Sequence, residues 1–170
     1  MLNKAELFAK AAHDSIQHKR KYTQDPYWIH PQRVASIVAM MTEDTEVIAA
    51  AWLHDVLEDV APNNKVFNEK AIEHEFGDRV LQLVLEVTDI SKPSDGNRAT
   101  RKLIDRNHLA QASNEGKLIK LADMIDNVID ISKHDPDFAI VFKKEVALDL
   151  PYLASGDELL YRRLKYLLEK

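Results

Sequence analysis

The sequence contains no cysteine among its 170 residues. This absence excludes disulfide bonds, thiolate metal ligands and cysteine nucleophiles together, and it is typical of proteins from a reducing compartment. The chain also lacks a run of 18 consecutive apolar residues, the length that a membrane-spanning helix needs. Its first ten residues, which include Lys4 and Glu6, lack the uninterrupted apolar segment of a secretory signal. We therefore expect a cytoplasmic protein with no membrane partner.

Positive charge is also scarce, since 23 Lys and Arg stand against 28 Asp and Glu, for a formal net charge of −5. A domain that binds duplex nucleic acid usually carries a basic surface, so we expect no nucleic-acid partner of that kind. An anionic small-molecule substrate would have to be held by a few local cations. The length is typical of one domain, and we predict a single domain over residues 1–170. No sequence feature bears on the oligomeric state.

Glycine is rare as well, with four residues, and apolar positions recur at spacings of three and four. Both features predict an all-α protein folded as a compact helical bundle. Helices with apolar stripes are expected over residues 34–41, 49–60 and 118–129. Asp44 or Thr45 can cap the second of these helices, and Asp135 can cap a later one.

The helix expected over residues 49–60 carries four polar residues opposite its apolar stripe: His54, Asp55, Glu58 and Asp59. They share one face, because residues three and four positions apart are neighbours on a helix. A solvent-exposed polar face is the ordinary interpretation of such a pattern. Here, however, no Lys or Arg occurs between residues 34 and 64, so the carboxylates repel one another without a countercharge. A bound divalent cation would supply that charge, with imidazole and carboxylate ligands.

The helix expected over residues 118–129 has a second acidic stripe, at Asp123, Asp126, Asn127 and Asp130. Taken alone, this spacing is typical of the solvent-facing side of an amphipathic helix. Upstream, His30 immediately precedes a proline that can begin a helix, so its imidazole is expected at a helix entrance. A capping or packing role would be the ordinary interpretation of that histidine by itself.

Taken in order, His30, His54-Asp55 and Asp123 resemble the H…HD…D signature of the HD superfamily of metal-dependent phosphohydrolases. The short sequence motifs around the signature are more specific. In order and spacing they are similar to motifs of the hydrolase domain of RelA/SpoT homologues and of small alarmone hydrolases. These motifs are Pro26-Tyr27-x-x-His30-Pro31, Leu53-His54-Asp55-x-x-Glu58-Asp59, Phe76-Gly77-x-x-Val80, Glu86-Val87-Thr88-Asp89 and Lys120-Leu121-Ala122-Asp123-x-x-x-Asn127.

The resemblance implies an HD-domain bundle in which one divalent ion, usually manganese in this family, has four ligands: His30, His54, Asp55 and Asp123. Two neutral imidazoles and two carboxylates would leave such an ion formally neutral, with positions open for water and a phosphoryl oxygen. The resemblance further implies three residues that act beside the metal. Glu58 and Asp59 would position and activate the attacking water, and Asn127 would lie near the metal and the substrate.

Substrate contacts are implied at several basic residues. The family's basic pair, which contacts the guanine base, corresponds to Arg20 and Lys21 or, in an alternative alignment, to Lys19 and Arg20. The stretch after residue 89 loosely resembles the family's phosphate-contacting segment and offers three cations: Lys92, Arg98 and Arg101.

Other residues near these motifs carry weaker expectations. Tyr22, Tyr27 and Trp28 can form a wall for a nucleobase, because aromatic faces stack on bases. His13 and His18 lie among charged residues without a paired motif, and we expect neither to contact metal or substrate.

The favoured hypothesis is a metal-dependent phosphohydrolase that removes the 3′-pyrophosphate from guanosine tetra- or pentaphosphate. Two alternatives stay open. The same fold can act on another nucleotide or phosphorylated small molecule, or it can be a metal-stabilised module that senses nucleotide without turnover. The pair Glu58 and Asp59 argues against a sensor, because binding alone does not require groups that activate water.

Overall fold

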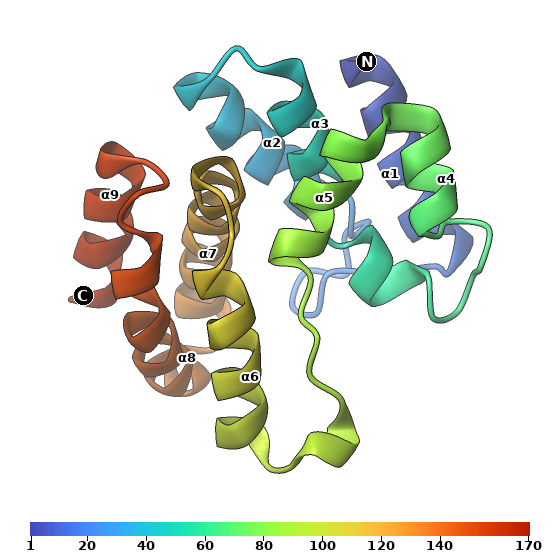
Figure 1. The fold of residues 1–170 in the computed structure, drawn as a ribbon. Helices are drawn as coiled ribbons and strands as arrows, with labels where there is room; N and C mark the ends of the chain where they lie inside the picture. Colours follow the sequence, from blue (N-terminus) through green and yellow to red (C-terminus); the bar gives the residue numbers. More distant parts are fainter. The chain divides into compact units, whose positions relative to one another are not determined.

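The computed structural model describes all of residues 1–170, and it contains helices and no strands (Figure 1). The all-α prediction is confirmed. The nine α-helices are α1 (Leu2–Ser15), α2 (Ile29–Met41), α3 (Thr45–Leu53), α4 (Glu69–Phe76), α5 (Asp78–Val87), α6 (Arg98–Ala110), α7 (Asn114–His134), α8 (Pro136–Asp149) and α9 (Glu158–Leu168). Three short turns of other helix types complete the chain: η1 (Val56–Val60), η2 (Pro93–Asp95) and η3 (Leu150–Leu153).

Tertiary contacts divide the chain into two compact units, Met1–Thr88 and Asp89–Lys170. We call them the first and the second unit, and each is described by itself. The prediction of a single domain over residues 1–170 stays a prediction. No helix in either unit has the length and the apolar character needed to cross a membrane.

Helix α3 is the centre of the first unit. Its sequence is apolar on all sides, and the seven residues from Val47 to Leu53 are buried, as expected of a helix surrounded by others. It packs against α1, α2 and α5. The three alanines at positions 49–51 allow neighbouring helices to approach α3 closely. Helix α1 also has buried alanines, at positions 5, 9 and 12. This packing fixes the end of α3, where two of the predicted metal ligands follow.

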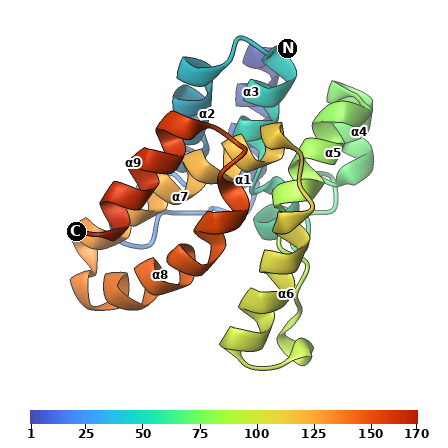
Figure 2. The same cartoon turned by 60° about the vertical axis from the view of Figure 1, so that its left-hand side comes forward.

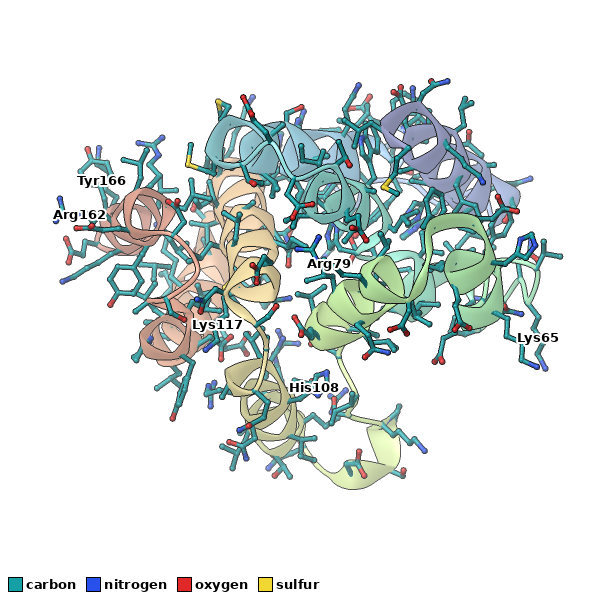
Figure 3. The ribbon with its side chains drawn as sticks, turned by 45° about the horizontal axis from the view of Figure 1, so that its top comes forward. Lys65, Arg79, His108, Lys117, Arg162 and Tyr166 are labelled. Carbon is teal, nitrogen blue, oxygen red and sulfur yellow. The ribbon has the colours of Figure 1, made fainter.

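The start of α3 is held by a side-chain cap and an ion pair. The Asp44 carboxylate accepts hydrogen bonds from the backbone N–H groups of Glu46 and Val47, as the capping prediction required. Arg79 of α5 donates to both oxygens of Asp44, at 2.8 and 3.1 Å (Figure 3). The arginine lowers the pKa of the Asp44 carboxyl group. Helices α3 and α5 are therefore tied together at the end of α3 opposite the candidate ligands.

The structure corrects the single helix expected over residues 49–60. The α-helix ends at Leu53, and after two turn residues the chain continues as the π-helical turn η1. The apolar residues Val56 and Val60 are both buried, so the apolar spacing persisted although the hydrogen-bonding pattern changed. Short π-helical segments occur frequently at functional sites. Here the change of helix type places His54 and Asp55 between two helical segments rather than within one.

Helix α7 is the corresponding centre of the second unit, and α8 and α9 pack against it (Figure 2). Its 21 residues include a long buried apolar stripe. Gly156, in the turn before α9, lies so close to α7 that a Cβ atom there would stand 2.7 Å from the backbone nitrogen of Leu118. Asp135 caps α8 by accepting from the Phe138 N–H, which confirms that prediction. The outer face of α9 presents Arg162 and Tyr166 (Figure 3).

Candidate metal centre

Three of the four predicted metal ligands come together in the first unit. Ligand atoms of His30, His54 and Asp55 all lie within 4.8 Å of one another. The Asp55 Oδ2 atom is 3.1 Å from the Nε2 atom of His54 and 3.6 Å from the Nε2 atom of His30. Both histidines are buried. We call these three residues the His-His-Asp trio.

The end of α3 determines which nitrogen of His54 can bind a cation. The Nδ1 atom lies 2.7 Å from the backbone oxygen of Ala51. A carbonyl oxygen only accepts hydrogen bonds, so Nδ1 carries a proton and donates it. In the neutral ring, Nε2 then holds a lone pair. Such a contact to a backbone carbonyl is the usual way in which a metal-binding histidine is fixed in its tautomer.

The second imidazole comes from the start of α2. His30 is the second residue of that helix and precedes Pro31, which confirms its expected place at a helix entrance. Its backbone N–H donates to the backbone oxygen of Tyr27, at 2.9 Å. With neutral imidazoles, the Nε2 lone pair of His54 and the Asp55 carboxylate face each other at 3.1 Å, and two acceptors at that distance require a proton or a metal cation between them. The donor set of the trio therefore fits a divalent ion.

The carboxyl groups of Glu58 and Asp59 follow the trio on η1. Burial, together with the charges of Asp55 and Glu58, raises the pKa of Asp59 to about 8. A group with a pKa near the operating pH exchanges protons efficiently, which suits general acid or base chemistry. The backbone N–H of Asp59 donates to the backbone oxygen of Asp55, at 2.9 Å. This bond keeps Glu58 and Asp59 attached to the trio despite the change of helix type.

The fourth predicted ligand, Asp123, belongs to the second unit. Its carboxylate is held on α7: the Nζ atom of Lys120 lies 3.0 Å from Oδ2, and the Nδ2 group of Asn127 donates to Oδ1 at 2.8 Å. Asp123 and Asp126 are both buried, which corrects the interpretation of this stripe as a solvent-facing side. That Asp123 joins the His-His-Asp trio stays a prediction.

The predicted substrate-binding cations are divided between the units. In the first, Arg20 is nearly buried with its guanidinium 5.4 Å from the centre of the Tyr27 ring, while Lys21 is exposed beside Tyr22. In the second unit, Arg98 makes two hydrogen bonds to the Glu145 carboxylate, at 2.6 and 2.9 Å.

The other two cations of the second unit differ in exposure. Lys92 is exposed in a loop that Asp105 fastens to α6 through the N–H groups of Ile90 and Ser91. Arg101 of α6 is half-buried, and its Nε atom is buried without a hydrogen bond. Arg98 is therefore already paired with a carboxylate. A substrate contact by Lys92 or Arg101 stays a prediction.

Three residues around the trio make contacts that the sequence did not predict. The Tyr27 hydroxyl donates to Asp55 Oδ2 at 2.7 Å, and the ring stacks on His18 with centroids 3.7 Å apart. His13 is fully buried beside both rings. The nearness of Tyr27 to His30 in the sequence was the only available signal. The contacts of His13 and His18 depend on how residues 16–28 fold back onto α1, which no spacing rule describes.

Comparison with known proteins now adds to this geometry. Residues 5–147 match the family described as HD domain, a span that includes every predicted site residue. The chain belongs to the HD-domain family.

A Xenopus tropicalis protein named guanosine-3′,5′-bis(diphosphate) 3′-pyrophosphohydrolase MESH1 is 35% identical over 144 residues, covering 81% of this chain and 76% of that protein. A guanosine-3′,5′-bis(diphosphate) 3′-pyrophosphohydrolase of Aquifex aeolicus is 42% identical over 131 residues. The match covers 75% of this chain but only 17% of the Aquifex protein.

A solved structure supports the same relationship. It is described as a metazoan orthologue of SpoT that hydrolyses ppGpp, and it matches with a TM-score of 0.82 at 28% identity. The match covers 99% of this chain and 93% of that one. The chain is thus an HD-domain phosphohydrolase related to the MESH1 and SpoT hydrolases of ppGpp.

Proposed function

We propose that this HD-domain protein removes the 3′-pyrophosphate from guanosine tetra- or pentaphosphate with the help of one divalent metal ion. The observation that carries the proposal is the His-His-Asp trio, in which the tautomer of His54 is fixed by the Ala51 carbonyl and its Nε2 atom faces the Asp55 carboxylate. The similarity to proteins named as 3′-pyrophosphohydrolases supports the choice of substrate.

The metal would be held by the trio and by Asp123, and the family resemblance favours manganese. A divalent ion, when bound, polarises a phosphoryl group and makes water more acidic. The protein's own contribution begins with the ligands, whose orientation is set by the end of α3 and the start of α2. Buried histidines at these positions also exclude bulk water from one side of the site.

Glu58 and Asp59 would take the proton from the attacking water. The water oxygen bonds to the phosphorus attached to the ribose O3′, the bond from that phosphorus to O3′ breaks, and O3′ receives a proton as pyrophosphate is released. A carboxylate oxygen of Glu58 suits the role of base. Asp59, which follows Glu58 on η1, would hold a proton and return it to O3′.

Basic side chains would bind the substrate's guanine and phosphates. Arg20, held over the Tyr27 ring near the trio, is the best supported of these residues. Lys21 would join it, and Lys92, Arg98 and Arg101 would provide cations from the second unit. Because Arg98 already pairs with Glu145, its contribution would require that ion pair to loosen.

The test combines metal analysis with a product assay on the purified full chain. We expect about one bound ion per chain and release of pyrophosphate from 3′-pyrophosphorylated guanosine nucleotides, lost on chelation and restored by manganese. His54→Ala should lose both properties, whereas the matched variant His74→Ala, at an exposed histidine, should keep them.

Two outcomes would replace the proposal. Cleavage of another nucleotide, with the 3′-pyrophosphorylated guanosine untouched, would move the function to a different phosphorylated substrate. Tight nucleotide binding without any product, in protein of confirmed metal content, would favour a sensing module.

A further inference from the structure

The Tyr27 hydroxyl touches the atom on which the trio converges. It donates to Asp55 Oδ2 at 2.7 Å, and this oxygen is also the one that faces the Nε2 atoms of His54 and His30. An aspartate side chain rotates about two bonds, so a hydrogen bond from a fixed donor limits where its oxygens can point. The phenol therefore constrains the carboxylate while leaving both imidazole nitrogens directed at it.

The Tyr27 ring is itself held on several sides. The His18 imidazole lies parallel to it, with centroids 3.7 Å apart and an angle of 6° between the planes. The His13 ring is 4.8 Å away, and its Nδ1 atom is 3.1 Å from the Nδ1 atom of His18. The His13 contact ties the ring of Tyr27 to α1, one of the three helices that pack against α3.

This packing also argues against the expected role of Tyr27 as a wall for a nucleobase. One face of the ring is already covered by His18, and the Arg20 guanidinium lies 5.4 Å from its centre. A base would have to displace one of these groups in order to stack. The hydroxyl end, in contrast, reaches the trio without any rearrangement.

We propose that Tyr27 is a positioning residue, which fixes the Asp55 carboxylate for metal binding and is in turn held in place by the stacked His18. The inference rests on the proposed metal-dependent function and deepens it.

The decisive variant is Tyr27→Phe, which removes the hydroxyl and keeps the ring and its stacking. Titration calorimetry on the full chain, stripped of metal and then titrated with Mn²⁺, measures the dissociation constant without any need for turnover. We expect it to rise about 10- to 100-fold, the range observed when a hydrogen-bond partner of a metal ligand is lost. Tyr152→Phe, at an exposed tyrosine of the second unit, should leave it unchanged.

A second readout separates positioning from a general loss of stability. With saturating Co²⁺ in place of Mn²⁺, the visible absorption spectrum reports the ligand geometry around the ion. We expect Tyr27→Phe to shift this spectrum, while Tyr152→Phe reproduces the wild-type bands. His18→Ala, which removes the stacked ring, should weaken Mn²⁺ binding less than Tyr27→Phe does.

The outcomes distinguish this inference from the proposed function. If the wild type binds Mn²⁺ and Tyr27→Phe matches it in both affinity and Co²⁺ spectrum, the positioning role is wrong and the metal function survives. If the wild type takes up no divalent ion, both ideas fall. If Tyr27→Phe binds metal more weakly while the wild type cleaves no 3′-pyrophosphorylated guanosine, the inference stands and the substrate is wrong.

Discussion

Asp55 in the first unit and Asp123 in the second are both predicted metal ligands, but their surroundings differ in charge. Asp55 receives a hydrogen bond from the phenol of Tyr27 and faces two imidazoles. Asp123 lies 3.0 Å from the ammonium group of Lys120. A carboxylate that faces neutral imidazoles and a phenol can accept a metal cation without displacing an ammonium group, whereas a carboxylate that already has a lysine partner is a ligand only when the lysine yields.

The carboxyl groups beside the trio differ from a carboxyl group of the second unit that is paired with an arginine. Burial and the charges of Asp55 and Glu58 raise the pKa of Asp59 to about 8. In the second unit, the guanidinium of Arg98 lowers the pKa of Glu145. The carboxyl groups beside the trio therefore concentrate negative charge that a bound divalent ion would stabilise.

The largest expected effect comes from removing a ligand in each unit. His54→Ala should abolish metal retention, because it deletes an imidazole that nothing else in the trio can replace. Asp123→Ala should weaken Mn²⁺ binding by at least about two powers of ten if the second unit completes the site, more than the loss of a mere hydrogen-bond partner. Metal content after dialysis and calorimetric affinity measure both. Wild-type affinity in Asp123→Ala would show that the first unit binds metal alone.

The next prediction separates proton transfer from metal binding within the first unit. Glu58→Gln keeps the size of the side chain and removes its ability to take a proton. We expect metal to stay bound while kcat falls by about two to four powers of ten, the usual scale for the loss of a general base. Near-normal turnover would assign the base role to Asp59 instead, and Asp59→Asn would then show the larger loss.

Much of the fold could be predicted because local rules determine it. The caps at Asp44 and Asp135 follow from side chains that accept from the next N–H groups, and the structure has both. The grouping of His30 with His54 and Asp55 followed from a motif and is also found. The caps follow from residue type and spacing alone, whereas the grouping of the three ligands was implied by the family resemblance.

The remaining features depend on tertiary packing. The apolar spacing through Val56 and Val60 fits an α-helix and a π-helical turn equally well, so the break after Leu53 could not be predicted. The burial of Asp126 was not predicted, because an acidic stripe on an amphipathic helix ordinarily faces solvent. Nor does any pattern describe how the loop before α2 brings Tyr27 to Asp55.

A smaller effect concerns pH and tests whether the buried histidine nearest to Tyr27 and His18 is neutral in the folded protein. Burial lowers the pKa of His13 from 6.5 to about 4. The unfolded chain therefore takes up a proton near pH 6.5 while the folded protein resists it, so stability is lost as the pH falls between those values. From pH 7.5 to 5.0 the contribution is about 2 kcal/mol in the free energy of unfolding.

Urea unfolding of the chelated protein at the two pH values measures this loss. His13→Gln should be less stable than the wild type at pH 7.5 yet lose less stability on acidification. His74→Gln, at an exposed histidine, should keep the full wild-type dependence. An equal loss in His13→Gln and the wild type would mean that His13 is protonated in the folded protein.

The smallest effect tests the lysine that distinguishes the second unit. Lys120→Met keeps the apolar stem and removes the ammonium group beside Asp123. If Lys120 competes with the metal for that carboxylate, Mn²⁺ binding should tighten about fivefold, the equivalent of an ion pair worth about 1 kcal/mol. Lys117→Met, one turn earlier on α7 (Figure 3), should change nothing. Weaker binding in Lys120→Met would reverse the comparison, because the lysine would then be holding Asp123 in its ligating position just as Tyr27 is proposed to hold Asp55.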